Sequence, residues 1–552
     1  MKRVWLLIAG LSALYLVGGV QRDFWYPDEP DLAEITLHMI KSGDLLRLSL
    51  YGREFADYPP LYFWLTSAAG RLWGLHEWVL RLPTMLSAIG LLVVTGLWAG
   101  RRLGERVALW SVAALGTAYF FVWQAVNMHL DMPFAFLVGA AVFAYDLAGT
   151  AQHAGARWAG WCGAAALMGL ASLVKGPAGI VLPAGILGAD HLLRREWRGA
   201  FRVAALGVAG SVIFAAWAVA YARASGASNL AYFIFTQNIS RFLTGHSHLR
   251  PVHYYVANIW GNWAPWTLFL PLGLALAWRE ARREGNRALG LALLWFAAMF
   301  VFFTISRSKR QVYLLPLYPA AGILVGYAIA RLADAWGGER GLRWRVPAWV
   351  TVGGVLAAGL AGLAAMPFAG PRLGEHGDLL FPGFAAAAAL AAAGAWAVVQ
   401  LGKGRPPASM AAVAAGTALV YFIGLTWALP LLDDPVSAKA DGEWLARETR
   451  QGQADVIGAL RPRGGVLKES SALSFYSRIP IVTLASAEAV REHLKRTPNG
   501  LFLAKDADDP LVRELAEYEP IVLRRMQVGD DMLVVLRLRV RKVGNPPREK
   551  GA

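Results

Sequence analysis

The feature that most constrains this chain is a series of about thirteen apolar segments separated by short polar loops. A membrane-spanning helix needs about 20 mostly apolar residues, because every backbone polar group must be satisfied inside the hydrocarbon layer. The segments are 4–20, 78–99, 107–125, 131–148, 158–174, 176–190, 203–222, 260–278, 288–305, 311–331, 347–367, 379–400 and 409–430. We therefore expect a polytopic α-helical membrane protein with about thirteen spans. The first segment is expected to stay as an uncleaved anchor, because no small-residue cleavage site follows it.

The distribution of basic residues predicts the orientation of these spans. With the N-terminus in the cytoplasm, the loops assigned to the cytoplasmic side carry most of the arginines, as the positive-inside rule requires. These residues are Arg101, Arg102, Arg106, Arg194, Arg195, Arg198, Arg202, Arg279, Arg282, Arg283, Arg287, Arg340, Arg343, Arg345, Lys403 and Arg405. The net charge of +16 is thus spread over loops, and we expect no nucleic-acid binding.

Residues 431–552 have the composition of an ordinary soluble domain, whereas residues 1–430 form the predicted membrane domain with long external loops at 21–77 and 224–259. Short apolar runs at 465–467, 481–484, 501–503 and 532–536 predict strands, and 486–495 and 510–518 predict helices. This indicates a small α/β domain, which an odd number of spans places outside the cytoplasm. The charged tail from Arg541 is expected to be disordered.

Three acidic residues stand out in the first external loop. Asp28 and Glu29 open an amphipathic helical pattern, and Asp57 precedes two prolines. Carboxylates are favoured at helix N-termini and in turns, so structural roles are open for all three. The functional alternative is a general base or a metal ligand near the aqueous boundary.

A fourth carboxylate, Asp131, begins the predicted fourth span just before Pro133. An ionised side chain at the end of a membrane helix is energetically costly unless it faces water or a cation. Asp131 is therefore expected to face an aqueous cavity, with a helix cap as the alternative.

Several basic residues lie on the external side, against the topological rule. They are Lys175 and the cluster of Arg307, Lys309 and Arg310, which lies shortly before Tyr313. A phosphate or diphosphate at the membrane surface would account for them by charge-assisted hydrogen bonds, as would anionic lipid headgroups.

Three histidines also lie close together in the external loop 224–259. They are His246, His248 and His253, and their spacing matches no zinc motif, so hydrogen bonding remains open beside metal binding.

Taken together, these motifs resemble the aminoarabinose transferases that modify lipid A, relatives of the protein O-mannosyltransferases in the C-type glycosyltransferase superfamily. The resemblance covers residues from about 20 to 330. It rests on Asp28-Glu29 with Ala33-Glu34-Ile35, Met39 and Ser42-Gly43-Asp44; Phe55-Ala56-Asp57-Tyr58-Pro59; Leu130-Asp131-Met132-Pro133-Phe134; Val174-Lys175-Gly176; Ile239-Ser240-Arg241-Phe242 through His248, Pro251, Tyr254-Tyr255 and Pro265-Trp266; and Arg307-Ser308-Lys309 with Tyr313.

The resemblance implies a C-type fold in the bacterial inner membrane, a periplasmic C-terminal domain and a monomer. The implied partners are an undecaprenyl-phosphate-linked sugar donor, a lipid or glycan acceptor and membrane lipids. By position, Asp28 is similar to the catalytic carboxylate and Asp131 to the residue that orients it, with Glu29 as a further candidate. The implied donor-phosphate ligands are Lys175, Arg307, Lys309 and Tyr313. Asp57 and His248 stand where family members can hold a divalent metal such as Zn, Mg or Mn.

Two departures from the family pattern bear on the substrate. Asp31 stands where the family has a phosphate-contacting arginine, and Asp57-Tyr58-Pro59 replaces Glu-Lys-Pro. The loss of two external cations leaves the donor sugar and the acceptor open. The leading interpretation is an inverting glycosyltransferase; the alternatives are a flippase for an anionic lipid and a scaffold without activity.

Overall fold

The computed structural model describes residues 1–240, 243, 248–336, 342–451, 456–461, 467–506, 509–529 and 531–541. The predictions for His246, for residues 465–466 and for the tail beyond 541 lie outside these residues. The chain folds into two compact units. The helical unit contains Met1–Arg22, Leu45–Arg47 and Ala56–Leu431, and the C-terminal unit contains Asp23–Asp44, Leu48–Phe55 and Leu432–Ala552.

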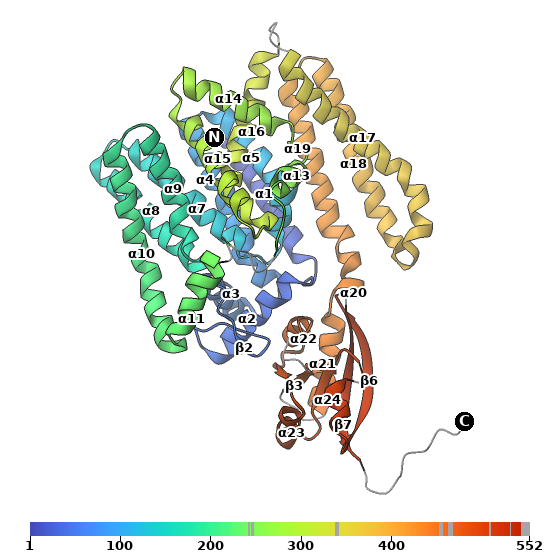
Figure 1. Cartoon of the computed structure of the whole chain (residues 1–552). Coiled ribbons are helices and arrows are strands. Elements are labelled where there is room, and N and C mark those ends of the chain that lie inside the picture. Colours follow the sequence, from blue (N-terminus) through green and yellow to red (C-terminus); the bar gives the residue numbers. More distant parts are fainter. Residues whose placement is uncertain are drawn as a thin grey trace. The chain divides into compact units, whose positions relative to one another are not determined.

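The helical unit is built almost entirely from helices (Figure 1). In chain order these are α1 (Lys2–Val20), α3 (Leu61–Trp73), α4 (Glu77–Arg102), α5 (Glu105–Thr117), α6 (Tyr119–Val126), α7 (Asp131–Gly149), α8 (Ala154–Lys175), α9 (Ala178–Leu193), α10 (Trp197–Ser225), α11 (Ala227–Ala231), η1 (Tyr232–Ser240), α13 (Tyr254–Asn262), α14 (Phe269–Arg283), α15 (Arg287–Ile305), η2 (Gln311–Leu317), α16 (Tyr318–Ala335), α17 (Leu342–Leu373), η4 (Gly374–Leu379), α18 (Leu380–Gly402), α19 (Pro406–Ile423), η5 (Gly424–Ala428) and η6 (Pro430–Leu432).

The predicted class, a polytopic helical membrane protein, is confirmed, but the count of thirteen spans is not. Among the described residues, nine helices are long and apolar enough to cross a bilayer, or ten if α5 and α6, which meet at 66°, form one broken span. The other three predicted spans correspond to helices α8, α9 and α14. None of these helices is by itself both long enough and apolar enough to be counted as a span.

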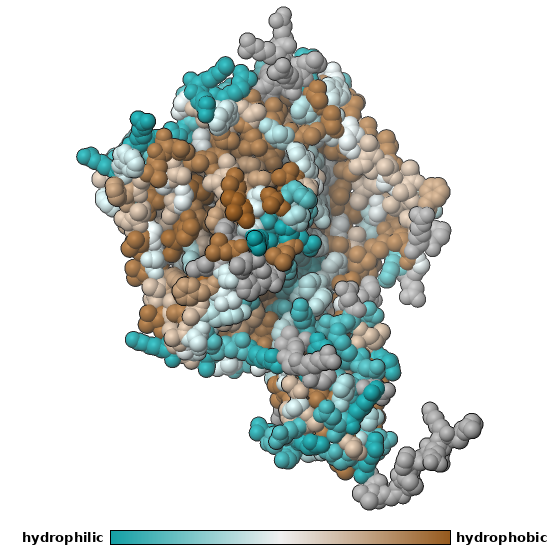
Figure 2. Space-filling view, viewed as in Figure 1, coloured by the Kyte–Doolittle hydropathy of each residue, from teal (hydrophilic) through white to brown (hydrophobic). Residues whose placement is uncertain are grey.

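The outward-facing side chains explain why these helices suit a bilayer. Figure 2 shows broad apolar surface over the helical unit. On α10, for example, Phe201, Val208 and Val212 are all largely exposed, which is stable only where lipid replaces water. The segment Gln311–Leu332, by contrast, is almost entirely buried and forms the centre of the unit.

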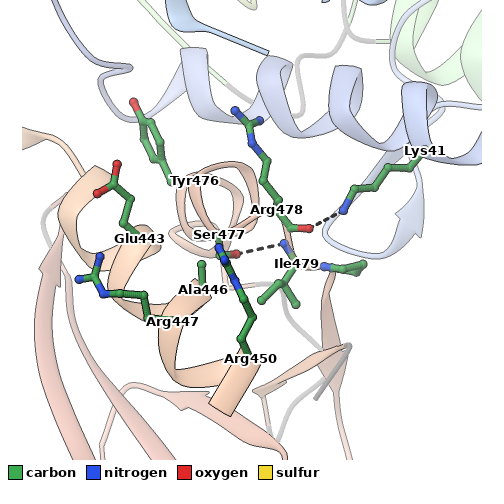
Figure 3. A pocket seen from close by; sticks show the side chains of 10 residues that line it. Lys41, Glu443, Ala446, Arg447, Arg450, Tyr476, Ser477, Arg478 and Ile479 are labelled. Atoms are coloured by element: carbon green, nitrogen blue, oxygen red, sulfur yellow. Dashed lines mark hydrogen bonds between the residues drawn. The ribbon is translucent and has the colours of Figure 1, made fainter. Parts of the chain in front are cut away.

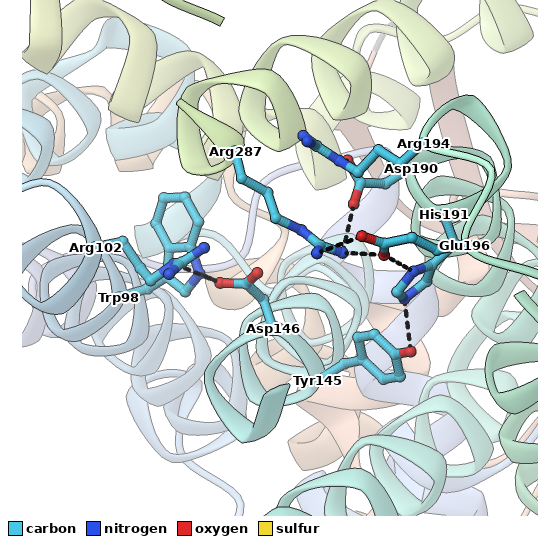
Figure 4. Close-up of polar contacts among 9 residues, drawn as sticks. All are labelled: Trp98, Arg102, Tyr145, Asp146, Asp190, His191, Arg194, Glu196 and Arg287. Carbon is cyan, nitrogen blue, oxygen red and sulfur yellow. Dashed lines mark hydrogen bonds and ion pairs between the residues drawn. The ribbon is translucent and has the colours of Figure 1, made fainter. Parts of the chain in front are cut away.

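A network of charged side chains joins α4, α7, α9 and α15 near the C-terminal end of α7 (Figure 4). The Arg287 guanidinium donates to Asp190 at 3.2 Å and to Glu196 at 3.1 Å. Tyr145 and Asp146 of α7 join this region through His191 and Arg102, respectively. Asp146 lies fifteen residues after Asp131 on α7, so the two carboxylates are about 22 Å apart along the helix axis.

The C-terminal unit holds a five-stranded mixed sheet in the order β4-β3-β5-β7-β6, which confirms the predicted small domain with a sheet. Its elements are α2 (Asp28–Ser42), β1 (Ser49–Leu50), β2 (Arg53–Glu54), α20 (Asp433–Val436), α21 (Lys439–Gln451), β3 (Ile457–Leu460), α22 (Ser470–Ser477), β4 (Ile481–Leu484), α23 (Ala487–Arg496), β5 (Leu501–Ala504), α24 (Pro510–Arg513), β6 (Tyr518–Val528) and β7 (Asp531–Val540). Strands β3, β4 and β5 run parallel, and β7 is antiparallel to β5 and β6.

The sheet has a hydrophobic core on each face. Leu445 of α21 and Leu473 of α22 pack in one core, whereas Val490 of α23 and Leu511 of α24 pack in the other. Burial on both faces explains why β3 and β5 are apolar throughout.

The sequence located β4, β5, β7 and α23 but missed other elements of this unit. Strands β3 and β6 and helices α21 and α22 were not predicted. The helix predicted for 510–518 was wrong in extent, because α24 ends at Arg513 and Tyr518 already begins β6. Strand β6 alternates too weakly to be recognised, since it is an edge strand with many exposed side chains.

Much of the first external loop belongs to the C-terminal unit. The Tyr476 hydroxyl of α22 accepts a hydrogen bond from the Phe24 backbone N–H at 2.8 Å, and the Phe24 ring packs edge-on against Phe475 at 5.1 Å. The predicted amphipathic helix is α2, whose apolar residues Leu32 and Ile35 are buried in the protein.

Candidate active site

Two antiparallel helices of the helical unit bring Asp131 and Lys175 together. Asp131 is the first residue of α7 and Lys175 the last residue of α8, and the two helices pack along each other. A carboxylate at a helix N-terminus and an ammonium at a helix C-terminus are both stabilised by the helix dipoles. Gly176 then ends α8 with a φ of 71°, a backbone conformation that favours glycine.

Asp131 and Lys175 form an ion pair that further side chains surround. The Lys175 ammonium binds Asp131 Oδ1, and His129 Nδ1 lies 3.0 Å from Asp131 Oδ2. The ammonium also lies 4.8 Å from the centre of the Tyr313 ring and 5.8 Å from that of Phe134. The pair is therefore a buried charged site whose cation faces aromatic rings, an arrangement that stabilises the ammonium beyond its carboxylate partner.

This ion pair lines a cavity of about 430 Å³ in the helical unit. One part of the wall is polar and contains Asp57, Asp131, Lys175, Gln237, Asn238, Ser306, Ser308 and Tyr313. The remainder is mostly apolar, with Phe134, Val181, Phe233, Ile234, Leu243, Phe302 and Phe303 among its side chains. An apolar cavity with a few converging polar groups is the usual form of a small-molecule site.

Asp57 lies in the same cavity and is held by a residue that sequence reasoning did not single out. The Gln237 side-chain amide donates to Asp57 Oδ1 at 2.7 Å and lies at the same distance from the Tyr232 hydroxyl. Gln237 and His129 are thus the site residues that were missed. The signal was present, since Gln237 lies two residues before the stretch that begins at Ile239, and His129 lies directly before Leu130-Asp131.

The other predicted phosphate ligands lie outside the described lining of this cavity. Arg307 is exposed, whereas Lys309 is buried and its ammonium donates to the backbone carbonyls of Ser306 and Arg250, the latter at 3.3 Å. The Lys309 backbone N–H also donates to the His248 carbonyl at 3.0 Å. In this arrangement Lys309 joins two segments that are distant in the sequence, and its role as a phosphate ligand stays a prediction, as does that of Arg307.

The residues predicted to hold a metal do not form a metal site in the described part of the chain. The Asp57 carboxylate is bonded to Gln237, and the His248 side chain is exposed. No group of three or more His, Cys, Asp or Glu side chains is placed to bind an ion among these residues. This donor set does not fit a resident divalent metal.

Asp28 and Glu29 belong to the C-terminal unit and open α2. Glu29 is buried, and its carboxylate accepts a hydrogen bond from the Trp25 backbone N–H at 3.2 Å. This contact satisfies a free donor just before the helix, which supports the structural alternative for Glu29. Asp28 is half-buried and its assignment as the catalytic carboxylate remains a prediction.

Asp31, the residue that departs from the family pattern, lies one turn further along α2. Its carboxylate accepts a hydrogen bond from the Tyr51 hydroxyl at 2.7 Å. Tyr51 and Gly52 form the turn between β1 and β2 and have positive φ angles of 55° and 72°, as a two-residue hairpin turn requires. Burial, together with the nearby carboxylates of Glu34 and Asp28, raises the pKa of Asp31 to about 7, although hydrogen bonds from Ser471 and Tyr51 oppose the shift.

We expect this shift to make the protein less stable as the pH rises from about 4 to 7. In that range the folded chain keeps a proton on Asp31 that the unfolded chain releases, and above about 7 both states are ionised. The variant Asp31→Asn, which keeps an acceptor for Tyr51, should therefore lose part of this dependence and melt higher than the wild type at pH 8. Melting midpoints in detergent at pH 5 and 8 measure the effect, with Glu488→Gln on exposed α23 as the control. Equal pH dependence in both variants would contradict the assignment.

Comparisons with known proteins agree with this geometry. The sequence profile of the family described as dolichyl-phosphate-mannose-protein mannosyltransferase matches residues 57–221. An undecaprenyl phosphate-alpha-4-amino-4-deoxy-L-arabinose arabinosyl transferase of Pseudomonas aeruginosa is 28% identical over 408 residues, covering 73% of this chain and 71% of that protein. An uncharacterized protein of Aquifex aeolicus is 27% identical over 59% of this chain and 63% of its own length.

Solved structures extend the similarity to nearly the whole chain. ArnT from Cupriavidus metallidurans, in a crystal structure with bound undecaprenyl phosphate, is 25% identical with a TM-score of 0.76, and the match covers 97% of each chain. The oligosaccharyltransferase of Archaeoglobus fulgidus shares only the fold, with a TM-score of 0.52 at 10% identity over 97% of this chain and 76% of that one. The chain is therefore similar to the aminoarabinose transferases over most of its length and has the fold of these multi-pass membrane glycosyltransferases.

Proposed function

We propose that this protein is an inverting glycosyltransferase that moves a monosaccharide from a polyprenyl-phosphate donor to a lipid or glycan acceptor at the periplasmic face of the bacterial inner membrane. The observation that carries the proposal is the cavity in which the Lys175–Asp131 pair meets a largely apolar wall. A prenyl chain with a phosphate at one end needs both features in one site. The ArnT structure with bound undecaprenyl phosphate supports the same donor class.

In this proposal Lys175 binds the donor phosphate and stabilises it as the leaving group. Negative charge grows on the phosphate as its bond to the sugar breaks, and a fixed ammonium in a site that excludes water stabilises that charge. Asp131 and the Tyr313 ring hold the ammonium in place before the donor arrives. Asp131 is then a positioning residue, because it acts on the phosphate through Lys175.

The acceptor hydroxyl must lose a proton as it attacks the sugar carbon, and a carboxylate is the usual base. We assign this role to Asp28 by its position in the family motif.

The names of the arabinosyl transferases specify 4-amino-4-deoxy-L-arabinose, but here Asp31 and Tyr58 stand where the family has cations. A neutral hexose, a uronic acid or a pentose remains compatible with the site, as does an acceptor similar to lipid A.

Mass spectrometry of the lipid and glycan fractions from cells with and without the protein tests this function. We expect one acceptor to gain the mass of a single monosaccharide only when the protein is present, and to lose that gain when polyprenyl-phosphate sugar synthesis is blocked. Identical fractions from the two cell types, together with transport of a labelled lipid by the purified protein, would overturn the proposal.

A further inference from the structure

The C-terminal unit joins two parts of the chain that are far apart in the sequence. One part begins with residues 23–27, which lead directly into α2 and the proposed base Asp28, and which we call the entry segment. The other part is residues 432–552, which we call the C-terminal segment. Each of the four residues 23–26 is contacted by an element of the C-terminal segment. The chain that leads to Asp28 is therefore bound just before it reaches the base.

Asp433 of α20 holds the entry segment through both oxygens of its carboxylate. Oδ2 accepts a hydrogen bond from the Asp23 backbone N–H at 3.1 Å, and Oδ1 accepts one from the Trp25 indole N–H at 2.8 Å. Hydrogen bonds to a carboxylate are stronger than those between neutral groups. The Asp23 carboxylate in turn accepts hydrogen bonds from the Ser437 hydroxyl and the Lys439 ammonium, both at 2.9 Å. The two carboxylates thus fix the entry segment to α20 and to the start of α21.

Two further elements of the C-terminal segment contact the middle of the entry segment. The Tyr476 hydroxyl of α22 accepts a hydrogen bond from the backbone N–H of Phe24, whose side chain is buried. Gly529, in the turn between β6 and β7, lies so close to Tyr26 that a Cβ at this position would come within 2.9 Å of the Tyr26 ring. The φ of Gly529 is 60°, so the turn also requires the conformation that favours glycine. The entry segment is therefore held by helices and by a strand turn.

The other end of α2 is bound to the same segment (Figure 3). The Lys41 ammonium donates to the backbone carbonyl of Arg478, the residue that follows α22. Between these two ends α2 packs against α22, and Ile35 and Leu37 are buried. Helix α2 is thus held before its first residue and near its last one, which restricts both its position and its rotation about its own axis.

The contacts of the entry segment reach Asp28 through the first turn of α2. The Trp25 backbone N–H donates to the Glu29 carboxylate at 3.2 Å, and the indole of the same residue donates to Asp433. The residue next to Asp28 is therefore bonded to a residue that the C-terminal segment holds. A general base must lie within hydrogen-bond distance of the proton that it removes. A displacement of about 1 Å can lower the rate of such a step about 100-fold.

We propose that the C-terminal segment positions Asp28 for the transfer reaction through Asp433 and Tyr476. The proposal rests on the proposed function and adds two positioning residues to it. They are positioning residues because they act on the reaction through the entry segment and Asp28. The C-terminal segment is then required for the chemical step itself, beyond any part that it has in binding a substrate.

The test removes two acceptors of the entry segment in the variant Asp433→Ala/Tyr476→Phe. The control, Asp441→Ala/Tyr518→Phe, makes the same two substitutions where Asp441 pairs with an arginine of β6 and Tyr518 packs against the second sheet core. Transfer is measured with full-length protein in phosphatidylcholine nanodiscs. The first variant should lower kcat roughly 10- to 100-fold. It should leave KM for the donor unchanged, because the proposed donor ligand Lys175 belongs to the helical unit. The control should match the wild type in both constants.

The same substitutions in an Asp28→Asn background separate positioning from a general loss of structure. In that background Asp433→Ala/Tyr476→Phe should cause no further loss of the residual transfer, because no base is left to be positioned. A further loss by the same factor as in the wild-type background would overturn the proposal. Asp433→Asn alone keeps an acceptor for the Trp25 indole and should retain more activity than Asp433→Ala.

Hydrogen exchange gives a readout that does not depend on sugar transfer. The backbone N–H groups of residues 23–31 should exchange faster in Asp433→Ala/Tyr476→Phe than in the wild type and the control, since their local opening costs less free energy. Unchanged exchange of these residues, or a kcat equal to that of the control, would overturn the proposal. Absence of transfer by the wild type would instead reject the proposed function. Faster exchange in the variant would in that case still show that Asp433 and Tyr476 hold the entry segment.

Discussion

Replacing Lys175 with alanine is expected to lower sugar transfer at least about 100-fold, the loss typical for removing one fixed group that stabilises charge in the transition state. The Lys175 ammonium is the cationic group among the described residues that line the cavity, so it can neutralise a departing phosphate, and it is already held beside Asp131 and Tyr313. Most of the loss should appear in kcat, because the charge on the phosphate is greatest as the bond to the sugar breaks. Lys175→Arg should recover part of the activity, since it keeps the charge but not the geometry.

The matched control for this prediction is Arg157→Ala. Arg157 lies on the same helix, α8, eighteen residues from Lys175 and thus about 27 Å away along the axis. This control should leave transfer unchanged, and both variants should insert in the membrane in equal amounts. Full activity of the correctly inserted Lys175→Ala variant would remove the main support for a phosphate site in this cavity.

Replacing Asp28 with asparagine is expected to reduce transfer by about 100-fold or more, the usual contribution of a general base. Asparagine has the same shape and still accepts hydrogen bonds, so α2 should keep its start at this residue. The loss should not be rescued by a higher acceptor concentration, because the variant lacks the ability to take the proton. Initial rates at saturating donor and acceptor measure the effect.

Glu29→Gln distinguishes chemistry from helix stability at the same site. Glu29 is buried and bonded to the Trp25 backbone, and a glutamine oxygen can accept the same hydrogen bond. We therefore expect this variant to retain transfer within a few fold of the wild type and to melt at a slightly lower temperature. If Glu29→Gln lost as much activity as Asp28→Asn, the base could not be assigned to Asp28 alone.

The sequence predicted the central part of the site because a charged side chain within a membrane is energetically costly unless it has a partner or faces water. Asp131 at the lip of one apolar segment and Lys175 at the end of another were both costly positions, and the structure pairs them. Asp57 and Tyr313 line the same cavity. Gln237 was missed because a neutral amide in a loop is common and its importance comes only from its contact with Asp57.

Other assignments stay predictions, because they depend on contacts between distant segments. Lys309 has the charge of a phosphate ligand, but the fold turns its ammonium toward the carbonyls of Ser306 and Arg250. Asp57 and His248 are ligand types that metals accept, yet no third ligand joins them among the described residues. Strand β3 is only four residues long, and its pairing with β4 and β5 is what makes it a strand.

The sequence by itself determined that this chain spans a membrane and where most of its helices lie, because hydrophobic length and charge bias act locally along the chain. Only the tertiary structure decided that most of the first external loop, including α2 with Asp28 and Asp31, packs as one unit with residues 432–552. It also decided that Asp433 binds the indole of Trp25, which lies 408 positions before it in the sequence. Such groupings depend on side chains far apart in the chain that become neighbours, and no local pattern of residues encodes them.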